Sequence, residues 1–553
     1  MERRWYPIWD PRIPKVLIPE RSILKHFSDS VQAGPERVAI SFYGRDVTYG
    51  ELNSTTEKCA WGLTGLGVKK GDRVGLFMQN CPQFVISYYG ILRAGAVVVA
   101  INPMYKHAEL EYQLRDSGAE TLILLDALFP EVKKATERMT LKNLIVTSFK
   151  DYLPENPSLP LAPEMRQSNM PIPGCHDFLE FLDQASSRVL PEVTDLKEDI
   201  ALLQYTGGTT GLPKGAVITH NILAHNVAGA TLWFGYTRED VHMGMMPFSH
   251  VQGMTQAMNS SLFSGGRLVI LARFTPETLA RAIEQYKGTV WKGNTTMVIA
   301  MIQWPEIHRY DLSSLKLVTY GGAPMPAEIL EQLRLMVPKA TFGEGYGLTE
   351  TLSGGGAITP LHRPKAGFIG IPFISTDIRV VDLETGSREV EPNEEGEITI
   401  SGATVMKGYW NRPDETAEVL QDGWLYTGDI GRMDEEGYLT LSGRKKELIK
   451  CSGFSVFPTE VEDLLYKHPA VAEVTVIGVP DPYRGEAPKA FIVLRPEHRG
   501  KITEDEIVEW TKDNMAAYKR PRVVEFRDEL PKSGAGKILR RLLAEEETTR
   551  QSS

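Results

Sequence analysis

Cysteine is scarce in this sequence, and long apolar runs are missing. The 553 residues include four cysteines and no C-x-x-C pair, so neither zinc nor a disulfide framework is indicated and the cytoplasm is expected. The longest apolar stretch, 84–101, is interrupted by Arg93 and two glycines, which favours a helix followed by a strand over a bilayer span. The N-terminus lacks a signal-peptide core. Secretion and membrane spanning are therefore not predicted, and peripheral membrane contact stays open but unsupported.

An excess of positive charge is also missing. The 61 Lys and Arg residues are outnumbered by 71 Asp and Glu residues, which leaves a formal net charge of -10. Because nucleic acids are held by clustered basic side chains, no nucleic-acid partner is expected, and anionic ligands must be held locally. The hydrophobic share of 42% and the charged share of 24% are ordinary for a globular protein. The length predicts roughly three to four structural units.

A glycine- and threonine-rich segment, YTGGTTGLPKGAV at 205–217, lies between two strand-like segments. Glycine lets backbone N–H groups approach an anion, threonine hydroxyls add donors, and Lys214 adds a mobile positive charge. Pro213 and Gly215 flank this lysine and exclude a Walker loop, and the glycine spacing excludes the dinucleotide fingerprint. The segment predicts a different polyphosphate loop, with a solvated surface turn as the alternative reading.

Short apolar runs alternate with helical segments early in the chain. Thr48 and Glu51 form a capping box that opens a helix, and the proline-rich stretch 153–173 is expected to be an exposed connection. The alternation predicts an α/β fold with parallel sheets covered by helices. Residues 378–402 change to strands and polar turns and indicate a β-rich subdomain. Strands are expected at 73–78, 96–101 and 121–126.

Four further segments follow the phosphate loop: YGLTE (346–350), YTGD (426–429), GRKKELIKCSGF (443–454) and PKSGAGKILRR (531–541). Together the five motifs resemble those of the adenylate-forming enzymes, and among them the AMP-forming acyl-CoA synthetases, over roughly residues 20–541. The resemblance implies a large N-terminal domain at 1–443, a hinge at 444–446 and a small mobile α+β C-terminal domain at 447–553.

The resemblance implies that an acid and ATP give acyl-AMP and pyrophosphate, after which the thiol of coenzyme A (CoA) displaces AMP. Bringing a carboxylate to the α-phosphate joins two anions, so cations must converge there. By resemblance Lys537 bridges these anions, with Lys214 and Glu350 in the same catalytic set. Glu350 and Thr206 are expected to serve Mg2+, which prefers hard oxygen ligands.

The nucleotide is expected to contact several of the motifs. By resemblance, Asp429 accepts hydrogen bonds from the ribose hydroxyls and Arg444 donates to the same sugar. Taken alone, YTGD reads as a turn. The other implied ATP-binding residues are Thr206, Gly207, Gly208, Thr209, Thr210, Gly345, Tyr346 and Thr349.

A moving domain would let one site carry out both steps, because an anhydride must be protected from water before a thiol is admitted. Lys446 matches the family hinge. Rotation there would withdraw Lys537 and bring Lys450, a further catalytic candidate, to the site together with Gly453 for the thioester step.

The acid-binding end is expected around His250, which matches an aromatic position of the family; a merely packed histidine is the alternative. Amino-acid-activating relatives place an acidic side chain in this region, and the segment PFSHVQGM has none, so the resemblance disfavours an amino acid. Acetate-activating relatives carry a tryptophan-rich string before the Thr-Glu pair, whereas this chain has GEGYGLTE followed by small residues, so acetate is also disfavoured. A neutral lining implies an uncharged acyl group, either a fatty acid of medium or greater length or an aromatic or alicyclic acid. The other expected lining residues are Thr295, Thr296, Met297, Tyr320, Gly321, Gly322 and Gly354.

Three alternatives stay open. An idle member would bind nucleotide and acyl ligand as a sensor, although Lys537, Glu350 and Lys214 are intact. A carrier-protein arm could replace free CoA as the acyl acceptor, and luciferases share all five motifs. Acid-dependent pyrophosphate release, thioester formation with free CoA and absence of light distinguish these cases. Oligomeric state is not predicted.

Overall fold

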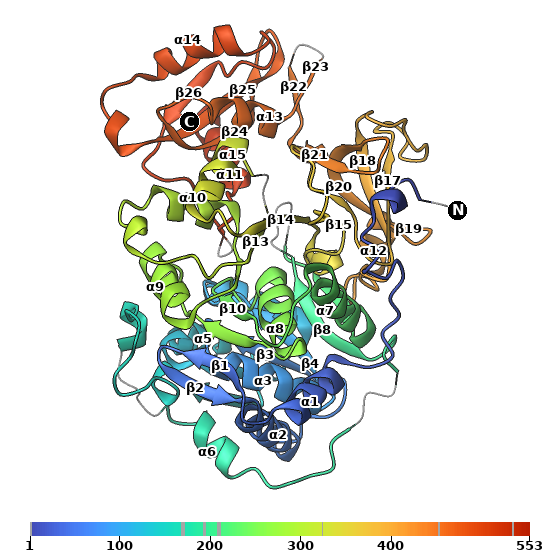
Figure 1. Ribbon diagram of the computed structural model, residues 1–553, viewed down its shortest axis with the longest axis vertical. Coiled ribbons are helices and arrows are strands. Elements are labelled where there is room, and N and C mark those ends of the chain that lie inside the picture. The colour runs from blue at the N-terminus through green and yellow to red at the C-terminus, as the bar shows by residue number, and fades with distance from the viewer. Residues whose placement is uncertain are drawn as a thin grey trace.

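The computed structural model describes residues 3–166, 172–191, 195–206, 212–322, 325–451, 454–533 and 536–552. Within these ranges the chain forms four β-sheets with helices packed against them (Figure 1). Two large α/β sheets come from the first two thirds of the chain, an antiparallel sheet follows, and a smaller mixed sheet is formed by the C-terminal residues. The predicted loop residues Gly207, Gly208, Thr209, Thr210 and Gly453 lie outside the described residues.

The first α/β sheet has the strand order β7-β6-β5-β3-β4-β8-β9 and is parallel except for the β8–β9 pair. Helices α3, α4 and α6 contact its strands. The strands are β3 (Arg73–Phe77), β4 (Val97–Ile101), β5 (Thr121–Leu125), β6 (Asn143–Thr147), β7 (His176–Asp177), β8 (Ile200–Tyr205) and β9 (Gly215–Thr219). The helices of this part are α1 (Ile23–Ala33), α2 (Tyr49–Gly65), α3 (Pro82–Arg93), α4 (His107–Ser117), α5 (Phe129–Thr136) and α6 (Phe178–Asp183).

The second α/β sheet has the order β16-β15-β14-β13-β12-β10-β11-β1-β2, with a parallel centre and antiparallel edges. Its strands are β1 (Val38–Phe42), β2 (Arg45–Thr48), β10 (Val241–Gly244), β11 (Arg267–Ile270), β12 (Val290–Lys292), β13 (Leu317–Gly321), β14 (Thr341–Tyr346), β15 (Ala357–Ile358) and β16 (Ile371–Pro372). The accompanying helices are α7 (His220–Phe234), the π-helix η5 (Gln252–Asn259), α8 (Ser260–Phe263), α9 (Pro276–Tyr286), α10 (Thr295–Gln303) and α11 (Ala327–Met336).

The local patterns of the sequence explain these elements. Thr48 accepts a hydrogen bond from the backbone of Glu51, whose side chain accepts one from the backbone of Thr48, and this capping box opens α2 as predicted. The three predicted strands are β3, β4 and β5, and the apolar stretch 84–101 is a helix followed by a strand. Strands β4 and β5 are buried throughout, which explains why they read as continuous apolar runs.

The connection at 153–173 is less exposed than predicted. Leu159 and Met165 are 4% and 1% exposed and pack in the main hydrophobic core. These two apolar side chains anchor an otherwise irregular stretch whose other described residues are exposed or half-buried, so it is an exposed connection with two buried anchors.

The antiparallel sheet confirms the predicted β-rich subdomain. YTGD lies within β20 and not in a separate turn, although Gly428 adopts a φ of 71° there. Its strands are β17 (Thr376–Val381), β18 (Gly396–Gly402), β19 (Leu420–Gln421), β20 (Trp424–Met433) and β21 (Leu439–Arg444), and helix α12 (Pro413–Val419) precedes β19.

The C-terminal sheet has the order β23-β22-β25-β24, with β26 paired to β25. Its own hydrophobic core includes Val461, Val476, Ile492 and Ile507. The elements are β22 (Ile449–Cys451), β23 (Phe454–Val456), α13 (Pro458–Leu465), β24 (Val471–Asp481), β25 (Gly485–Leu494), α14 (Glu504–Asn514), β26 (Val523–Phe526) and α15 (Arg540–Ser552).

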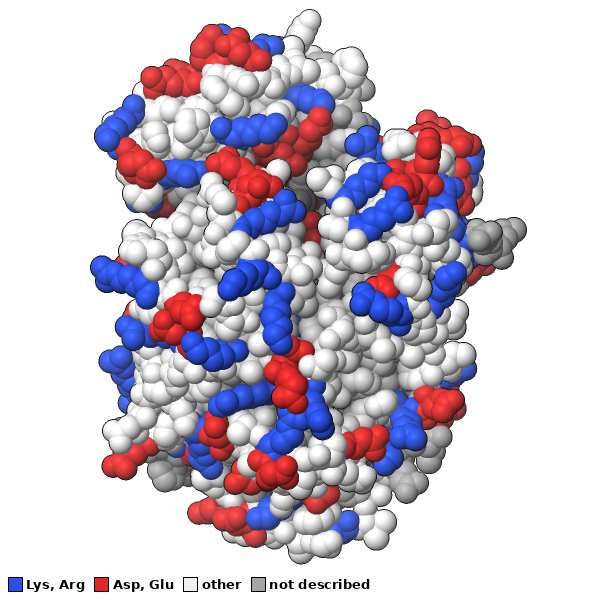
Figure 2. All heavy atoms as spheres, in the orientation of Figure 1, with Lys and Arg blue, Asp and Glu red and all other residues white. Residues whose placement is uncertain are grey.

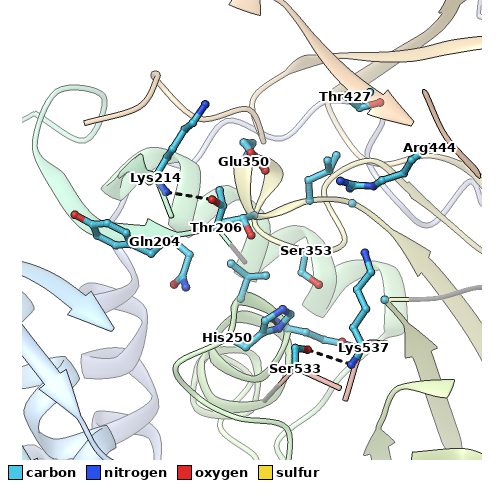
Figure 3. A pocket seen from close by; sticks show the side chains of 18 of the residues that line it. Gln204, Thr206, Lys214, His250, Glu350, Ser353, Thr427, Arg444, Ser533 and Lys537 are labelled. Atoms are coloured by element: carbon cyan, nitrogen blue, oxygen red, sulfur yellow. Dashed lines mark hydrogen bonds between the residues drawn. The ribbon is translucent and has the colours of Figure 1, made fainter. Parts of the chain in front are cut away.

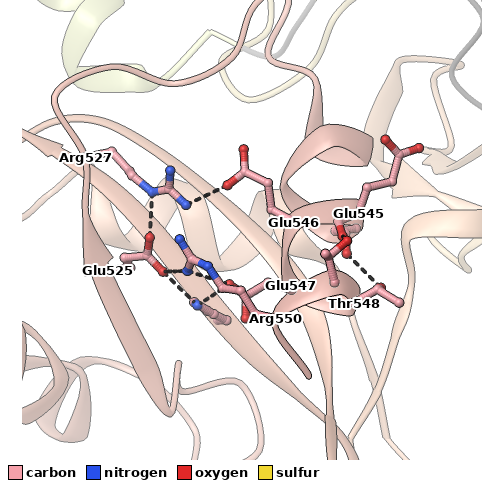
Figure 4. Close-up of polar contacts among 10 residues, drawn as sticks. Glu525, Arg527, Glu545, Glu546, Glu547, Thr548 and Arg550 are labelled. Atoms are coloured by element: carbon pink, nitrogen blue, oxygen red, sulfur yellow. Dashed lines mark hydrogen bonds and ion pairs between the residues drawn. The ribbon is translucent and has the colours of Figure 1, made fainter. Parts of the chain in front are cut away.

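Ion pairs tie α15 to the strands beneath it (Figure 4). Lys489 on β25 lies 2.8 Å from Glu525 of β26 and 2.6 Å from Glu547 of α15. Arg527 joins Glu525 to Glu546, also on α15. The Lys489 side chain is only 8% exposed, so its two carboxylate partners offset the cost of burying its charge. The network fixes the helix that directly follows the Lys537 segment.

Two further features of the structure are the distribution of charge on its surface and the length and polarity of its helices. On the face shown in Figure 2, Lys and Arg side chains are interspersed with Asp and Glu. Across the part of the chain that the structure describes, no helix is both long and apolar enough to cross a membrane.

Candidate active site

A cavity of 1080 Å³ opens where the C-terminal residues meet the strand ends of the second sheet and the antiparallel sheet. Figure 3 shows side chains from these separate parts of the chain directed into one space. The predicted site residues on its wall are Thr206, Lys214, His250, Tyr320, Gly321, Gly322, Gly345, Thr349, Glu350, Gly354, Arg444, Lys446 and Lys537.

The phosphate-loop end of the cavity holds Lys214. Its backbone N–H donates to the Thr206 hydroxyl at 3.2 Å, and its carbonyl accepts from the Thr206 N–H at 3.0 Å. Its ammonium group pairs with Glu415 and lies 5.1 Å from the centre of the Tyr409 ring. Lys214 is thus held at the cavity by groups on the segment before β19, and the roles predicted for it and for Thr206 stay predictions.

Glu350 is oriented by a residue that no motif indicated. The Tyr409 hydroxyl donates to Glu350 Oε1 at 2.6 Å, and burial together with the Glu350 charge raises the pKa of Tyr409, so the hydroxyl stays a donor. The other carboxylate oxygen, Oε2, points to no described partner. No cluster of three or more acidic, His or Cys side chains suited to a metal occurs in the described ranges. The Glu350 carboxylate and the Thr206 hydroxyl, both on the cavity wall, fit Mg2+, because this ion takes few protein ligands and also binds phosphate oxygens.

The predicted ribose site is built around Asp429, which is 4% exposed. Its carboxylate lies 2.8 Å from Arg444 Nε and accepts a hydrogen bond of 2.8 Å from the Tyr346 hydroxyl. Tyr346 and Arg444 therefore both hold Asp429, and of these three residues only Arg444 belongs to the cavity wall. Antiparallel pairing of β20 and β21 places Asp429 opposite Arg444, which explains why residues so far apart in sequence meet.

Lys537 reaches the cavity from the C-terminal segment. Its backbone N–H donates to Ser533 Oγ at 3.1 Å, which closes a tight loop. The side chain keeps solvent contact inside the cavity, yet the surrounding protein, followed by the positive charge of Arg444, lowers its pKa. Gly536 adopts a φ of 76°, and its carbonyl accepts a hydrogen bond of 2.8 Å from the Thr296 hydroxyl. This contact joins the loop to α10.

The acid end of the wall departs in part from expectation. His250 is there, with Tyr320, Gly321, Gly322 and Gly354, but Thr295, Thr296 and Met297 are not. Thr295 and Thr296 occupy the first turn of α10, and Thr296 faces the Lys537 loop. Burial and the charge of Lys537 lower the pKa of His250 to about 4, so its ring is neutral at pH 7. Its Nδ1 accepts from the Gln252 N–H at 3.3 Å, which leaves the proton on Nε2.

The His250 segment continues into the π-helix η5, a conformation that is rare and often found at functional sites. A β-carbon at Gly253 would collide with the carbonyl oxygens of Pro247 and Met246, so only glycine fits between the helix and the preceding loop. The glycine thereby lets the loop that carries His250 lie directly on η5.

Gly253→Ala is expected to destabilise the protein by about 1–3 kcal/mol and to weaken acid activation, because overpacking displaces the His250 loop. Thermal unfolding and acid-dependent AMP formation measure the two effects. Gly65→Ala is the matched control, since a β-carbon there meets its nearest atom at 3.5 Å. Equal melting temperatures for the Gly253 variant and this control would contradict the packing account.

The predicted hinge residue Lys446 precedes β22, and the predicted thioester-step residue Lys450 lies on that strand. Lys446 is exposed in a 3₁₀ turn, Lys445–Glu447, and belongs to the cavity wall, whereas Lys450 is exposed on β22 and does not. Arg540 pairs with Glu447 at 2.7 Å and with Glu462 at 2.6 Å, which ties the start of α15 to the residue after Lys446. The domain boundaries at 444–446 stay predictions.

Glu344 on β14 and Asp463 on α13 bring like charges together where the C-terminal sheet meets the second sheet. Burial, and then the charge of Asp463, raises the pKa of Glu344 to about 8. Asp463 keeps solvent contact, so its share is the smaller. A carboxyl group whose folded pKa exceeds its unfolded value of about 4.3 costs stability as pH rises between the two values.

Glu344→Gln is therefore expected to raise the melting temperature at pH 8.5 by about 2 °C or more, with the gain vanishing near pH 4. Scanning calorimetry across this pH range tests the sign. The exposed Glu155→Gln serves as control. A gain that is the same at both ends of the range would show that ionisation of Glu344 is not its cause.

Several wall residues were not predicted. Tyr409 holds Glu350, and Arg540 holds Glu447 and Glu462, and no residue spacing in the sequence indicates these contacts. Arg540 lies inside the PKSGAGKILRR segment, but the motif assigns it no role. Leu352 and Ser353 adopt φ values of 51° and 74°, strained for residues with side chains, and Ser353 lines the cavity. Only a glycine would have signalled that conformation in the sequence.

Comparisons with known proteins cover nearly the whole chain. Residues 27–410 match the family AMP-binding enzyme, and residues 460–537 match the AMP-binding enzyme C-terminal domain. The long-chain-fatty-acid–CoA ligase of Bacillus subtilis (strain 168) is 41% identical over 560 residues, covering 99% of this chain and 98% of the relative.

Solved structures show the same arrangement. An anthranilate CoA ligase in complex with anthranoyl-AMP superimposes with a TM-score of 0.86 at 26% identity, covering 96% of this chain and 98% of that one. The o-succinylbenzoate CoA synthetase of Bacillus subtilis, in complex with ATP and a magnesium ion, gives a TM-score of 0.78 at 28% identity, covering 94% and 99%. Each similarity extends over both parts of the chain that build the cavity wall.

Proposed function

The chain belongs to the AMP-binding enzyme family and is an AMP-forming acyl-CoA synthetase, and we propose that its substrate acid is a long-chain fatty acid. The observation that best supports the synthetase reaction is that Lys537, Glu350 and His250 line a single cavity, although they come from three distant parts of the chain. ATP is the nucleotide substrate. Mg2+ and free CoA are the further cofactor and cosubstrate that we propose.

The size and lining of the cavity support a long acyl chain. Its volume of 1080 Å³ is at the upper end for small-molecule sites, which leaves room for more than a nucleotide. Five side chains form what we call the acyl wall, and none of them is acidic. They come from α7, from η5 and the residue before it, and from β13 and β15. They are Phe234, Val251, Gln256, Thr319 and Ile358. The 41% identical relative named for long-chain fatty acids favours this class over aromatic acids.

In the first step, we propose, the acid carboxylate attacks the α-phosphorus of ATP beside Lys537, and the bond to the β-phosphate breaks, so that acyl-AMP forms and pyrophosphate leaves. The ammonium group offsets the repulsion between the two anions and stabilises the charge that builds in the transition state. Neutral His250 leaves the carboxylate to that single cation and offers its Nε2 proton as a donor. Lys214 and Thr206 would contact the phosphates, and Mg2+, held by Glu350, would supply further positive charge to the phosphate oxygens.

In the second step the CoA thiol displaces AMP from the acyl-AMP. In the observed conformation Lys537 faces the cavity and Lys450 lies outside its wall, an arrangement suited to the first step. Rotation near Lys446 would exchange these two lysines. The contacts of the Lys537 loop with Thr296 would have to break for that movement.

Lys537→Ala is expected to reduce acyl-AMP formation by about a thousandfold, while CoA transfer from supplied acyl-AMP stays within a few fold of wild type. Lys446→Pro is expected to show the opposite selectivity, because proline fixes φ at the proposed hinge. Single-turnover assays of each half-reaction measure both. Equal losses in the two half-reactions for Lys537→Ala, or normal thioester formation for Lys446→Pro, would contradict the division of roles.

Tyr409→Phe is expected to raise the Mg2+ concentration needed for half-maximal AMP formation by about tenfold, because Glu350 loses the donor that orients it. Titration of Mg2+ at saturating ATP and acid gives the value. Tyr310→Phe, outside the cavity wall, is the control. An unchanged Mg2+ dependence in Tyr409→Phe would remove Glu350 from the proposed metal site.

The cytoplasm remains the compartment that we propose. Cys59, Cys81, Cys175 and Cys451 are all free thiols, and burial raises the pKa of Cys59 and Cys81 to about 12, so these two are unreactive packing residues.

A further inference from the structure

Lys292, the last residue of β12, is 1% exposed and lies beside the acyl wall. It is the register partner of Thr319 on β13, so the two side chains project from the same face of the sheet on neighbouring strands. Thr319 belongs to the cavity wall. The lysine is therefore one strand away from the space in which we place the acyl chain.

Two aromatic residues separate the lysine from the cavity: Phe234, the last residue of α7, and Tyr236, which follows that helix. Lys292 Nζ lies 4.4 Å from the centre of the Tyr236 ring, and Tyr236 stacks on Phe234 with ring centres 5.5 Å apart. Phe234 is itself a wall residue. One layer of side chains thus lies between the amine and the acyl wall.

Polar atoms without hydrogen-bond partners gather at this place. Among the described residues, none bonds to Lys292 Nζ, Thr319 Oγ1, the Tyr236 hydroxyl or either ring nitrogen of His242, which pairs in register with Val290 on the face that carries Lys292. Asp240, on the segment between α7 and β10, is bound to Thr237, Thr289 and Lys316. Burial lowers the pKa of Lys292 well below its usual range, and no protein carboxylate offsets this.

An isolated buried amine costs several kcal/mol, and an apolar side chain of similar length would avoid that cost. Ordinary packing therefore does not explain a lysine here. A ligand oxygen would satisfy both the amine and the Thr319 hydroxyl. The flexible four-carbon stem of lysine allows its amine to turn toward Thr319 when such an oxygen arrives.

We propose that Lys292 and Thr319 form a polar end to the acyl wall and select acids that carry a hydroxyl or carboxylate oxygen at the end remote from the reacting carboxyl group. This inference rests on the proposed function, because it requires that the acyl chain of an activated acid lies along the acyl wall. It narrows the substrate class from fatty acids in general to those with an oxygenated far end.

The test uses the full-length enzyme with ATP, Mg2+ and CoA and a series of straight-chain acids of increasing length. Each acid is paired with the same acid bearing a terminal hydroxyl or a second carboxyl group, and kcat/KM for AMP formation is measured. For the chain length that spans the wall, we expect the wild type to favour an oxygenated acid by about tenfold or more, which corresponds to the cost of leaving a buried polar group without a partner. The hydroxyl and carboxylate arms show which oxygen is preferred.

Lys292→Met is expected to abolish this preference while plain acids are activated as well as before or better, since its side chain is apolar and of similar length. Thr319→Val is expected to reduce the preference in the same direction, and it keeps the inference testable if Lys292→Met fails to fold. Lys339→Met, an exposed lysine before β14, is the matched control and should keep the wild-type ratio.

The outcomes distinguish a failure of the proposed function from a failure of the proposed role of Lys292 and Thr319. If no acid of the series releases AMP, the proposed function has failed, and this inference with it. If plain acids are activated but the wild type and Lys292→Met give the same ratio of oxygenated to plain acid, the inference alone is overturned. A wild-type preference that is lost in both variants and kept in the control establishes it.

Discussion

A positive charge carried by the C-terminal segment into a cavity built by the earlier part of the chain is the interaction on which the structure depends. Lys537 occupies that cavity together with Glu350 and His250, and protein and the Arg444 charge around it lower its pKa. In the proposed mechanism this charge offsets the repulsion between a carboxylate and a phosphate.

The surrounding structure holds this lysine in place without fixing it permanently. Toward its own domain the segment is held firmly, because Arg540 binds Glu447 and Glu462 and the ion pairs of α15 fix the helix that follows. Toward the cavity the hold is lighter. It includes a hydrogen bond between Thr296 and Gly536, and the charge of Asp463 disfavours ionisation of the buried Glu344 at the same junction. Such an imbalance suits the rotation that we propose near Lys446, in which this part of the chain moves as one body between the two chemical steps.

Much of this could be predicted from sequence because the signals are local. Apolar runs and a capping box predicted the strands and α2, and motif order predicted the family and part of the cavity wall. What failed depends on tertiary contacts. The first turn of α10 faces the Lys537 loop, so Thr295 and Thr296 are not on the acid wall, and Tyr409 reaches Glu350 only through the folded chain. Nothing in the sequence around Lys292 indicates that this residue is buried beside aromatic rings and unpaired polar atoms, because these neighbours come from other strands and helices.

The central claim is that Lys537 joins acid and nucleotide in the conformation described here, before CoA takes part. Exchange of labelled pyrophosphate into ATP, measured with a long-chain fatty acid and without CoA, tests this most directly. The account predicts acid-dependent exchange under these conditions, because acyl-AMP forms reversibly in the closed cavity. Exchange that appears only after CoA is added, or with no acid at all, would contradict it.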